Sequence, residues 1–137
     1  MNYNLNKFIN AQKKDFETAR YELINGKKES HWMWYMFPQI KGLGKSYFSE
    51  YYGIESLDEA KEYYENEYLK KNMNDLIKII LELDCSDPKK VFGSPDDLKL
   101  KSSMTLFYLA TKDKRFILVL NKFYNGEFDE NTIDIIK

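Results

Sequence analysis

The sequence of 137 residues contains one cysteine, one histidine and three prolines, and each scarcity excludes a class of protein. Because Cys85 is the only thiol, the chain can form neither an internal disulfide nor a cysteine-based zinc site. The longest apolar runs, residues 32–37 and 116–120, are far too short to span a bilayer. The first residues also lack the basic start and the apolar stretch of a signal peptide. We therefore expect a cytoplasmic protein with no membrane partner.

An excess of charge of either sign is also missing. Lysine and arginine (21) nearly balance aspartate and glutamate (22), so the formal net charge is −1. Such a chain has no overall attraction for nucleic acid or for an anionic surface. A single histidine without a carboxylate cluster at ligand spacing is a poor basis for a metal site. We therefore expect no nucleic-acid partner, no metal and no cofactor.

What the sequence does contain is helical periodicity and many aromatic residues, which make up 16% of the chain. Apolar residues recur at helical spacing nearly throughout, and no convincing stretch alternates with the period of a strand. Glycines and prolines separate these segments. The predicted helices span residues 8–23, 30–37, 46–52, 56–65, 69–83, 88–92, 95–111, 114–125 and 129–136. We predict an all-α fold, a compact bundle of about eight helices in one domain that includes residues 1–137.

The most unusual segment is residues 30–39, with the sequence SHWMWYMFPQ. Its predicted helix is apolar on all sides, which favours a buried position, and Ser30 is a suitable capping residue. Aromatic residues at helical spacing usually fill a core, and His31 would then form a capping or buried hydrogen bond. Alternatively, Trp32 or Trp34 forms the wall of a pocket into which His31 points as an acid, a base or an anion ligand.

Gln12 is a polar residue on the apolar stripe of the first predicted helix. A buried amide without hydrogen-bond partners is costly, so Gln12 must find partners in the interior. Those partners are backbone groups in one hypothesis and a ligand in the other.

Two further segments carry residues suited to chemistry. Residues 42–46 (GLGKS) form a glycine turn before a helix, where free amides, Lys45 and Ser46 can hold an anion. The turn lacks the spacing of a phosphate loop and the strand that precedes one, and an ordinary interhelical turn is the alternative. Lys99, Ser102 and Ser103 share a helix face, so a lysine could activate a serine nucleophile. Close helix packing, with the hydroxyls bonded to the previous turn, is the alternative.

These motifs together resemble the bacterial domain-of-unknown-function family 1810, whose members are sometimes labelled calpastatin-like. The resemblance extends over essentially the whole chain. The most specific matches are SHWMW at 30–34, FPQ at 37–39, GLG at 42–44 and SSMTLF at 102–107. The resemblance implies a multihelical single domain and no settled activity. A calpastatin-like inhibitor would be disordered and rich in proline, which this chain is not. At Gly53 the family leads us to expect a small, alanine-like residue, and we expect glycine there only to loosen a helix end.

Two functions from different classes follow. In the first, the domain binds a small anionic ligand, such as a nucleotide or another phosphate-bearing compound, with a hydrolase or transferase as one version. His31 would then be the catalytic acid or base and Lys99 the charge stabiliser. The ligand-binding residues would be Gln12, Trp34, Gln39, Gly42, Gly44, Ser46, Ser102 and Ser103. In the second, the domain is a protein-interaction module or a homodimer without catalytic activity, and its exposed tyrosines form the contact surface. The candidate tyrosines are Tyr47, Tyr51, Tyr52, Tyr63, Tyr64 and Tyr68.

Overall fold

Polar side chains one residue ahead of the helices fix where several of them begin. Ser56 accepts a hydrogen bond from the amide of Glu59, Asn66 from that of Leu69, and Asp113 from that of Arg115. These bonds satisfy amides that have no partner within the helix itself. The caps explain why the boundaries predicted from the sequence lie close to the observed ones.

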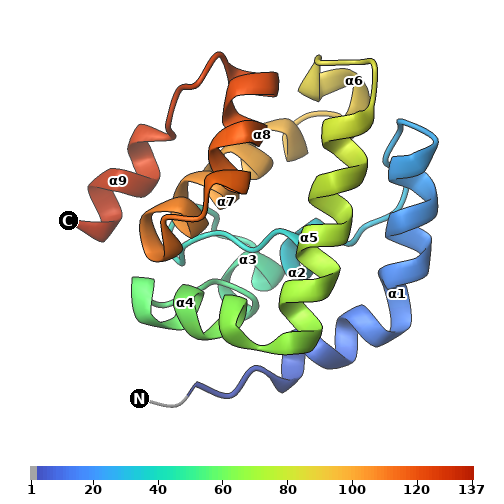
Figure 1. Ribbon diagram of the computed structural model, residues 1–137. Coiled ribbons are helices and arrows are strands. Elements are labelled where there is room, and N and C mark those ends of the chain that lie inside the picture. Colours follow the sequence, from blue (N-terminus) through green and yellow to red (C-terminus); the bar gives the residue numbers. More distant parts are fainter. Residues whose placement is uncertain (1–2) are drawn as a thin grey trace.

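The computed structural model describes residues 3–137, and within that range it contains nine helices and no strand (Figure 1). The helices are α1 (Asn6–Ile24), α2 (Met33–Met36), α3 (Tyr47–Tyr51), α4 (Leu57–Glu65), α5 (Glu67–Glu82), α6 (Pro88–Phe92), α7 (Asp96–Thr111), α8 (Lys114–Tyr124) and α9 (Glu130–Ile136). The predicted all-α fold is confirmed. Residues 116–120, which could have formed a buried strand in isolation, lie inside α8. No helix in the described part of the chain is both long enough and apolar enough to cross a membrane.

The helix α7 lies at the centre of the bundle, where it packs against α4, α6, α8 and α9. Residues 102–107 of α7 are all buried, as expected of a helix that is covered on every side. The helix α5 crosses the front of the view in Figure 1 and packs against α1, α4 and α8. The short helix α2 packs against α1.

One closed loop stands out between α2 and α4. An isolated parallel bridge joins Ile40 to Ile54, both buried. The amide of Lys41 donates to the carbonyl oxygen of Ile54 (2.7 Å), and the amide of Ile54 donates to that of Gln39 (2.8 Å). These bonds hold together the two ends of residues 41–53, which include α3. We call residues 41–53 the α3 loop.

Gly53 lies at the end of this loop, and its role differs from the predicted one. A Cβ atom at Gly53 would lie 2.9 Å from both the Cα of Lys41 and the carbonyl oxygen of Ser49. Both atoms belong to the backbone, so an alanine would force the chain to shift. Gly53 therefore permits the close approach of two backbone segments, and the expectation that it only loosens a helix end is wrong.

Candidate functional site

A pocket of about 420 Å³ opens beside α2, at the point where α1, α2 and the α3 loop meet. Four of its lining residues are aromatic. The lining residues are Ala11, Lys14, Asp15, His31, Trp34, Tyr35, Phe48 and Tyr52. Of the residues proposed from the sequence, His31 and Trp34 are therefore brought together here. Lys14, Asp15, Tyr35 and Phe48 belong to the same site, but sequence reasoning did not assign them to it.

The aromatic wall of the pocket is continuous because its rings pack against one another. The ring centroids of Trp34 and Phe48 lie 5.1 Å apart, as do those of Tyr35 and Tyr52. The Phe48 and Tyr52 rings, 6.2 Å apart and nearly parallel, join the two pairs. These separations are those of favourable aromatic pairs, so the wall has a defined shape.

The polar groups of the pocket lie beside this wall. The Tyr35 hydroxyl donates to the carboxylate of Asp15 and also lies 3.3 Å from the carbonyl oxygen of His31. Burial, together with the hydrogen bond and the negative charge of Asp15, raises the pKa of Tyr35 above its usual value. Tyr35 therefore stays protonated and remains a donor at neutral pH. The side chains of His31 and Lys14 are exposed and can reach a ligand from solvent.

The segment that precedes α2 is held in place by Glu22, near the end of α1. Its carboxylate accepts hydrogen bonds from the amides of Glu29 (2.8 Å) and Ser30 (2.9 Å) and from the Trp32 indole (2.9 Å). The Ser30 hydroxyl donates to the same carboxylate. Burial alone would raise the pKa of Glu22, but these hydrogen bonds lower it to about 2.

The role of Ser30 therefore differs from the predicted one. Trp32, with no side-chain cap, precedes α2, so Ser30 does not cap that helix. Sequence reasoning missed Glu22, although an acid beside Leu23 on the apolar side of an amphipathic helix was a usable signal.

Gln12 lies in the core behind α2, with only 1% of its surface exposed. Its Nε2 atom donates to the carbonyl oxygen of Tyr35 (2.7 Å) and to the hydroxyl of Tyr63 (2.8 Å). Its Oε1 atom accepts from the Nδ2 of Asn72 (3.0 Å). All of these partners are protein groups. The network joins α1, α2, α4 and α5, and the idea that Gln12 needs a ligand is not supported.

The residues proposed on α7 do not reach the pocket. The Lys99 ammonium is 3.5 Å from the carboxylate of Asp96 and lies 5.0 Å from the centroid of the Trp34 ring. It therefore contacts the Trp34 ring of the pocket wall without lining the pocket. The Ser102 hydroxyl lies 2.8 Å from the carboxylate of Asp129, the residue that caps α9, and Ser103 is fully buried. The structure therefore does not bring Gln12, Lys99 and these serines together in one pocket, because they pack between helices.

The glycine turn contributes to a second, much smaller cavity that shares part of the aromatic wall. This cavity, of about 10 Å³, is lined in part by Gln39 and Gly44, and Trp34, Phe48 and Tyr52 line both it and the larger pocket. Ser46 instead caps α3 by accepting from the amide of Ser49 (3.2 Å). Neither Ser46 nor Gly42 lines either cavity.

Metal-ligating side chains do not gather at this site. Among residues 3–137, no group of three histidine, cysteine, aspartate or glutamate side chains is placed to hold a metal ion. The pocket lining offers aromatic rings for stacking, the hydroxyl of Tyr35, the imidazole of His31 and the charged side chains of Lys14 and Asp15.

Comparisons with other proteins identify one similar solved structure and one matching family. The crystal structure at 1.38 Å of the conserved hypothetical protein Rv1873 from Mycobacterium tuberculosis is similar to this chain, with a TM-score of 0.94 and 38% sequence identity. The match covers 96% of this chain and 95% of that one. No curated protein matches the sequence. The model of a family described as a protein of unknown function (DUF1810) matches residues 2–136. The chain therefore belongs to the DUF1810 family.

Proposed function

We propose that the pocket between α1, α2 and the α3 loop binds a small molecule that carries a flat aromatic ring and an anionic group, such as a nucleotide. The observation that carries this proposal is the convergence of Trp34, Tyr35, Phe48 and Tyr52 on one pocket. Its volume of about 420 Å³ suits a ligand of this size, since ligand pockets span roughly 300–1,000 Å³. A ring that stacks on such a wall gains about 0.5–1.5 kcal/mol per aromatic contact beyond the burial of its area.

The polar residues suggest how such a ligand is oriented. Lys14 and His31 are exposed and carry nitrogen donors suited to a phosphate group, and a hydrogen bond from a lysine ammonium to phosphate is charge-assisted. Asp15 has a carboxylate that accepts from Tyr35 and can also accept from an amino group on the ligand ring. In this orientation a base-like ring stacks on the aromatic wall and its phosphate faces Lys14 and His31. The ligand then uses both the aromatic and the polar residues of the pocket.

The catalytic version of the proposal now depends on one residue. His31 lines the pocket and is the candidate acid or base for hydrolysis or group transfer. The Lys99 ammonium contacts the Trp34 ring and forms an ion pair with Asp96. We therefore propose that Lys99 positions Trp34 and does not contact the ligand.

Titration with adenosine and adenosine 5′-monophosphate, followed by calorimetry, tests the proposal. We expect the monophosphate to bind at least tenfold more tightly, a difference of about 1.4 kcal/mol. Lys14→Met should remove most of that preference and leave the affinity for adenosine unchanged. Phe48→Ala should weaken both ligands, because it removes part of the shared wall.

Lys13→Met is the matched control for this experiment. Lys13 is an exposed neighbour on α1 that does not line the pocket, so its replacement should alter neither affinity. Equal affinities for both ligands in all variants would contradict the anionic part of the proposal. No measurable binding of either compound, or of their guanosine equivalents, would contradict the ligand class.

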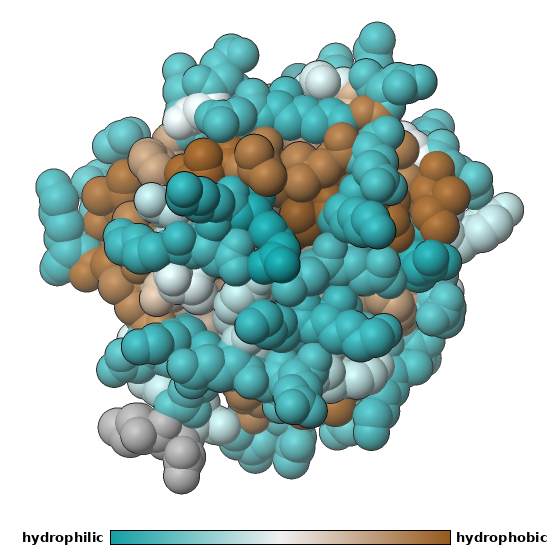
Figure 2. All heavy atoms as spheres, in the orientation of Figure 1, coloured by the Kyte–Doolittle hydropathy of each residue, from teal (hydrophilic) through white to brown (hydrophobic). Residues whose placement is uncertain are grey.

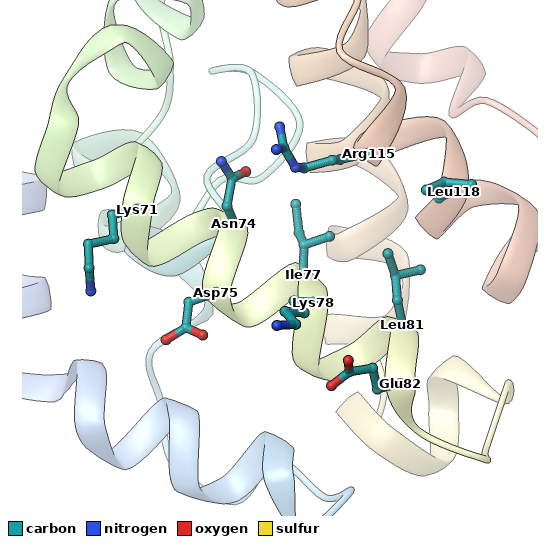
Figure 3. A pocket seen from close by; sticks show the side chains of 9 residues that line it. All are labelled: Lys71, Asn74, Asp75, Ile77, Lys78, Leu81, Glu82, Arg115 and Leu118. Carbon is teal, nitrogen blue, oxygen red and sulfur yellow. The ribbon is translucent and has the colours of Figure 1, made fainter.

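A groove of about 760 Å³ between α5 and α8 favours a second candidate function, self-association. Its floor includes Ile77 and Leu81 of α5 and Leu118 of α8, and 51% of the Leu118 surface is exposed (Figure 3). Figure 2 shows hydrophobic residues at the surface over this part of the molecule. Charged residues of both signs surround the floor, an arrangement that suits contact with a second copy across a two-fold axis. They are Lys71, Asp75, Lys78, Glu82 and Arg115.

This second candidate departs from the tyrosine surface predicted from the sequence. Tyr63 and Tyr64 are buried, and of the proposed tyrosines only Tyr47 and Tyr51 are strongly exposed. Light scattering over a range of concentrations should show dimers that Leu118→Asp abolishes. Leu98→Asp is the matched control, because Leu98 is 60% exposed but lies on α7 outside the groove. A strict monomer at every concentration would exclude self-association.

A further inference from the structure

The two tryptophans in residues 30–39 differ in how their indole N–H groups are satisfied. The Nε1 of Trp32 donates to the Glu22 carboxylate over 2.9 Å, whereas no protein group accepts from the buried Nε1 of Trp34. A buried donor without a partner costs about 1–3 kcal/mol, and native proteins contain few of them. The unpaired N–H lies on the very side chain that forms the pocket wall, so it calls for a functional explanation.

The Trp34 ring contacts both the central helix and the α3 loop. The Lys99 ammonium lies 5.0 Å from the ring centroid, and Lys99 belongs to the central helix α7. The ring centroid of Phe48 of α3 is 5.1 Å away, and 47% of the Phe48 surface is exposed. We expect the contact with Lys99 to hold Trp34 in place when Phe48 moves.

The α3 loop is built so that it can move as a unit. Its helix has five residues and none of them is buried. Beyond the ring contacts of Phe48 and Tyr52, a tie to the body of the protein is the hydrogen bond from the Lys7 ammonium to the carbonyl oxygen of Tyr51 (2.7 Å). Gly42, near the other end, has a φ of +107°, a conformation that favours glycine. Apart from Leu43 and Tyr52, which pack against the core, the loop makes few buried contacts, and such segments open at low free-energy cost.

We propose that the α3 loop swings open about the Ile40–Ile54 bridge and that the Trp34 indole N–H then donates a hydrogen bond to the bound ligand. This proposal rests on the proposed function and narrows it, because the ligand ring must carry an acceptor such as a ring nitrogen or a carbonyl oxygen. When Phe48 moves away from Trp34, the ligand ring enters between the two side chains and still contacts both. The small cavity then joins the larger pocket, since Trp34, Phe48 and Tyr52 line both. Trp34 is then a specificity-determining donor for acceptor-bearing rings.

Hydrogen exchange of the two indole protons, measured by ¹⁵N NMR, tests the opening without any ligand. Trp34→Phe assigns the two resonances. We expect the Trp34 proton to exchange at least tenfold faster than the Trp32 proton, whose bond to Glu22 serves as an internal reference. Lys7→Gln shortens the side chain and removes its charge, so it should weaken the tie to Tyr51, speed exchange at Trp34 several-fold and leave exchange at Trp32 unchanged. Lys13→Gln, the matched surface control, should change neither rate.

Adenosine 5′-monophosphate then tests the donor. Its binding should move the Trp34 indole proton resonance downfield, and Trp34→Phe, which keeps an aromatic wall, should weaken binding about tenfold. Binding that leaves this resonance and the affinity of Trp34→Phe unchanged would overturn the donor role. Slow exchange of the Trp34 indole proton that Lys7→Gln does not alter would overturn the opening. A water molecule trapped between Trp34, Gln39 and Ser49 would produce such slow exchange. Fast exchange at Trp34, together with a failure to bind the nucleotide in the titration, would support the opening and overturn the ligand class instead.

Discussion

Glu22→Ala should lower the free energy of unfolding by about 3 kcal/mol, because it leaves several donors without their shared acceptor. The Trp32 indole is buried, so its lost hydrogen bond is not recovered from water. The amides of Glu29 and Ser30 lose the same partner, and with it the anchor of the segment that leads into α2. Urea unfolding followed by circular dichroism measures the change.

The pH dependence of stability separates the contribution of the Glu22 charge from that of the size and packing of its side chain. Its pKa is about 2 in the folded protein and about 4.5 in the unfolded chain. Because the folded pKa is the lower one, the stabilisation is complete above pH 4.5 and is lost as the pH falls from 4.5 toward 2. Over that window the difference in unfolding free energy between the wild-type protein and Glu22→Gln should shrink, by up to about 3 kcal/mol at 1.36 kcal/mol per pKa unit.

An exposed glutamate on the same helix provides the control for these measurements. Glu17→Gln makes the same chemical change at an exposed position of α1 and should alter stability by less than about 0.5 kcal/mol at any pH. A wild-type protein and a Glu22→Gln variant whose stabilities fall in parallel below pH 4.5 would contradict the assignment.

Gln12→Glu should be at least as damaging, although it changes only one atom of the side chain. The amide nitrogen that donates to the Tyr35 carbonyl oxygen over 2.7 Å becomes a carboxylate oxygen, so two acceptors face each other in the core. Burial of the charge adds to the repulsion, and we expect a loss of about 3–5 kcal/mol at pH 7. A neutral carboxylic acid can donate to that carbonyl, so burial should raise the pKa of this carboxyl in the folded state. The loss should therefore grow as the pH rises above the pKa of a glutamate in the unfolded chain and should be smallest below that pKa.

Gln12→Met gives the matched comparison, because it has a similar size and no charge. It leaves the Asn72 amide without its acceptor and should cost about 1–3 kcal/mol with no dependence on pH between 4 and 7. Lys13→Met, at an exposed neighbouring position, should cost little. Equal stabilities for Gln12→Glu and Gln12→Met at pH 7 would show that the Gln12 network is not the buried contact described above.

The helices could be predicted from the sequence because their signals are local. Gly26 follows α1 in the left-handed region, and Asp87 caps α6 just before its first residue, Pro88. Close helix packing could also be predicted locally, because small residues such as Ser103 on a helix face indicate close contact. Residues 102–107 are indeed all buried. Such features depend on neighbours in the chain, which the sequence displays directly.

The pocket could be predicted only in part because it forms between distant segments. His31 and Trp34 were accessible to sequence analysis because an apolar helix with two tryptophans is unusual. Lys14 and Asp15 were not, because on a helix such as α1 they look like ordinary surface residues. The spacing of Lys99 from Ser102 and Ser103 suggests a shared site. In the structure Lys99 instead forms an ion pair with Asp96, three residues earlier on the same helix.

The bridge between Ile40 and Ile54 has a consequence for how this fold can diverge. Closing a loop costs conformational entropy that grows only slowly with its length, and here the closing contacts lie in the core. Positions of this loop other than Phe48, Tyr52 and Gly53 can thus be exchanged, and the loop can be lengthened, with little effect on the helices around it. Related proteins that keep the same bundle could in this way present different chemistry beside the same aromatic wall.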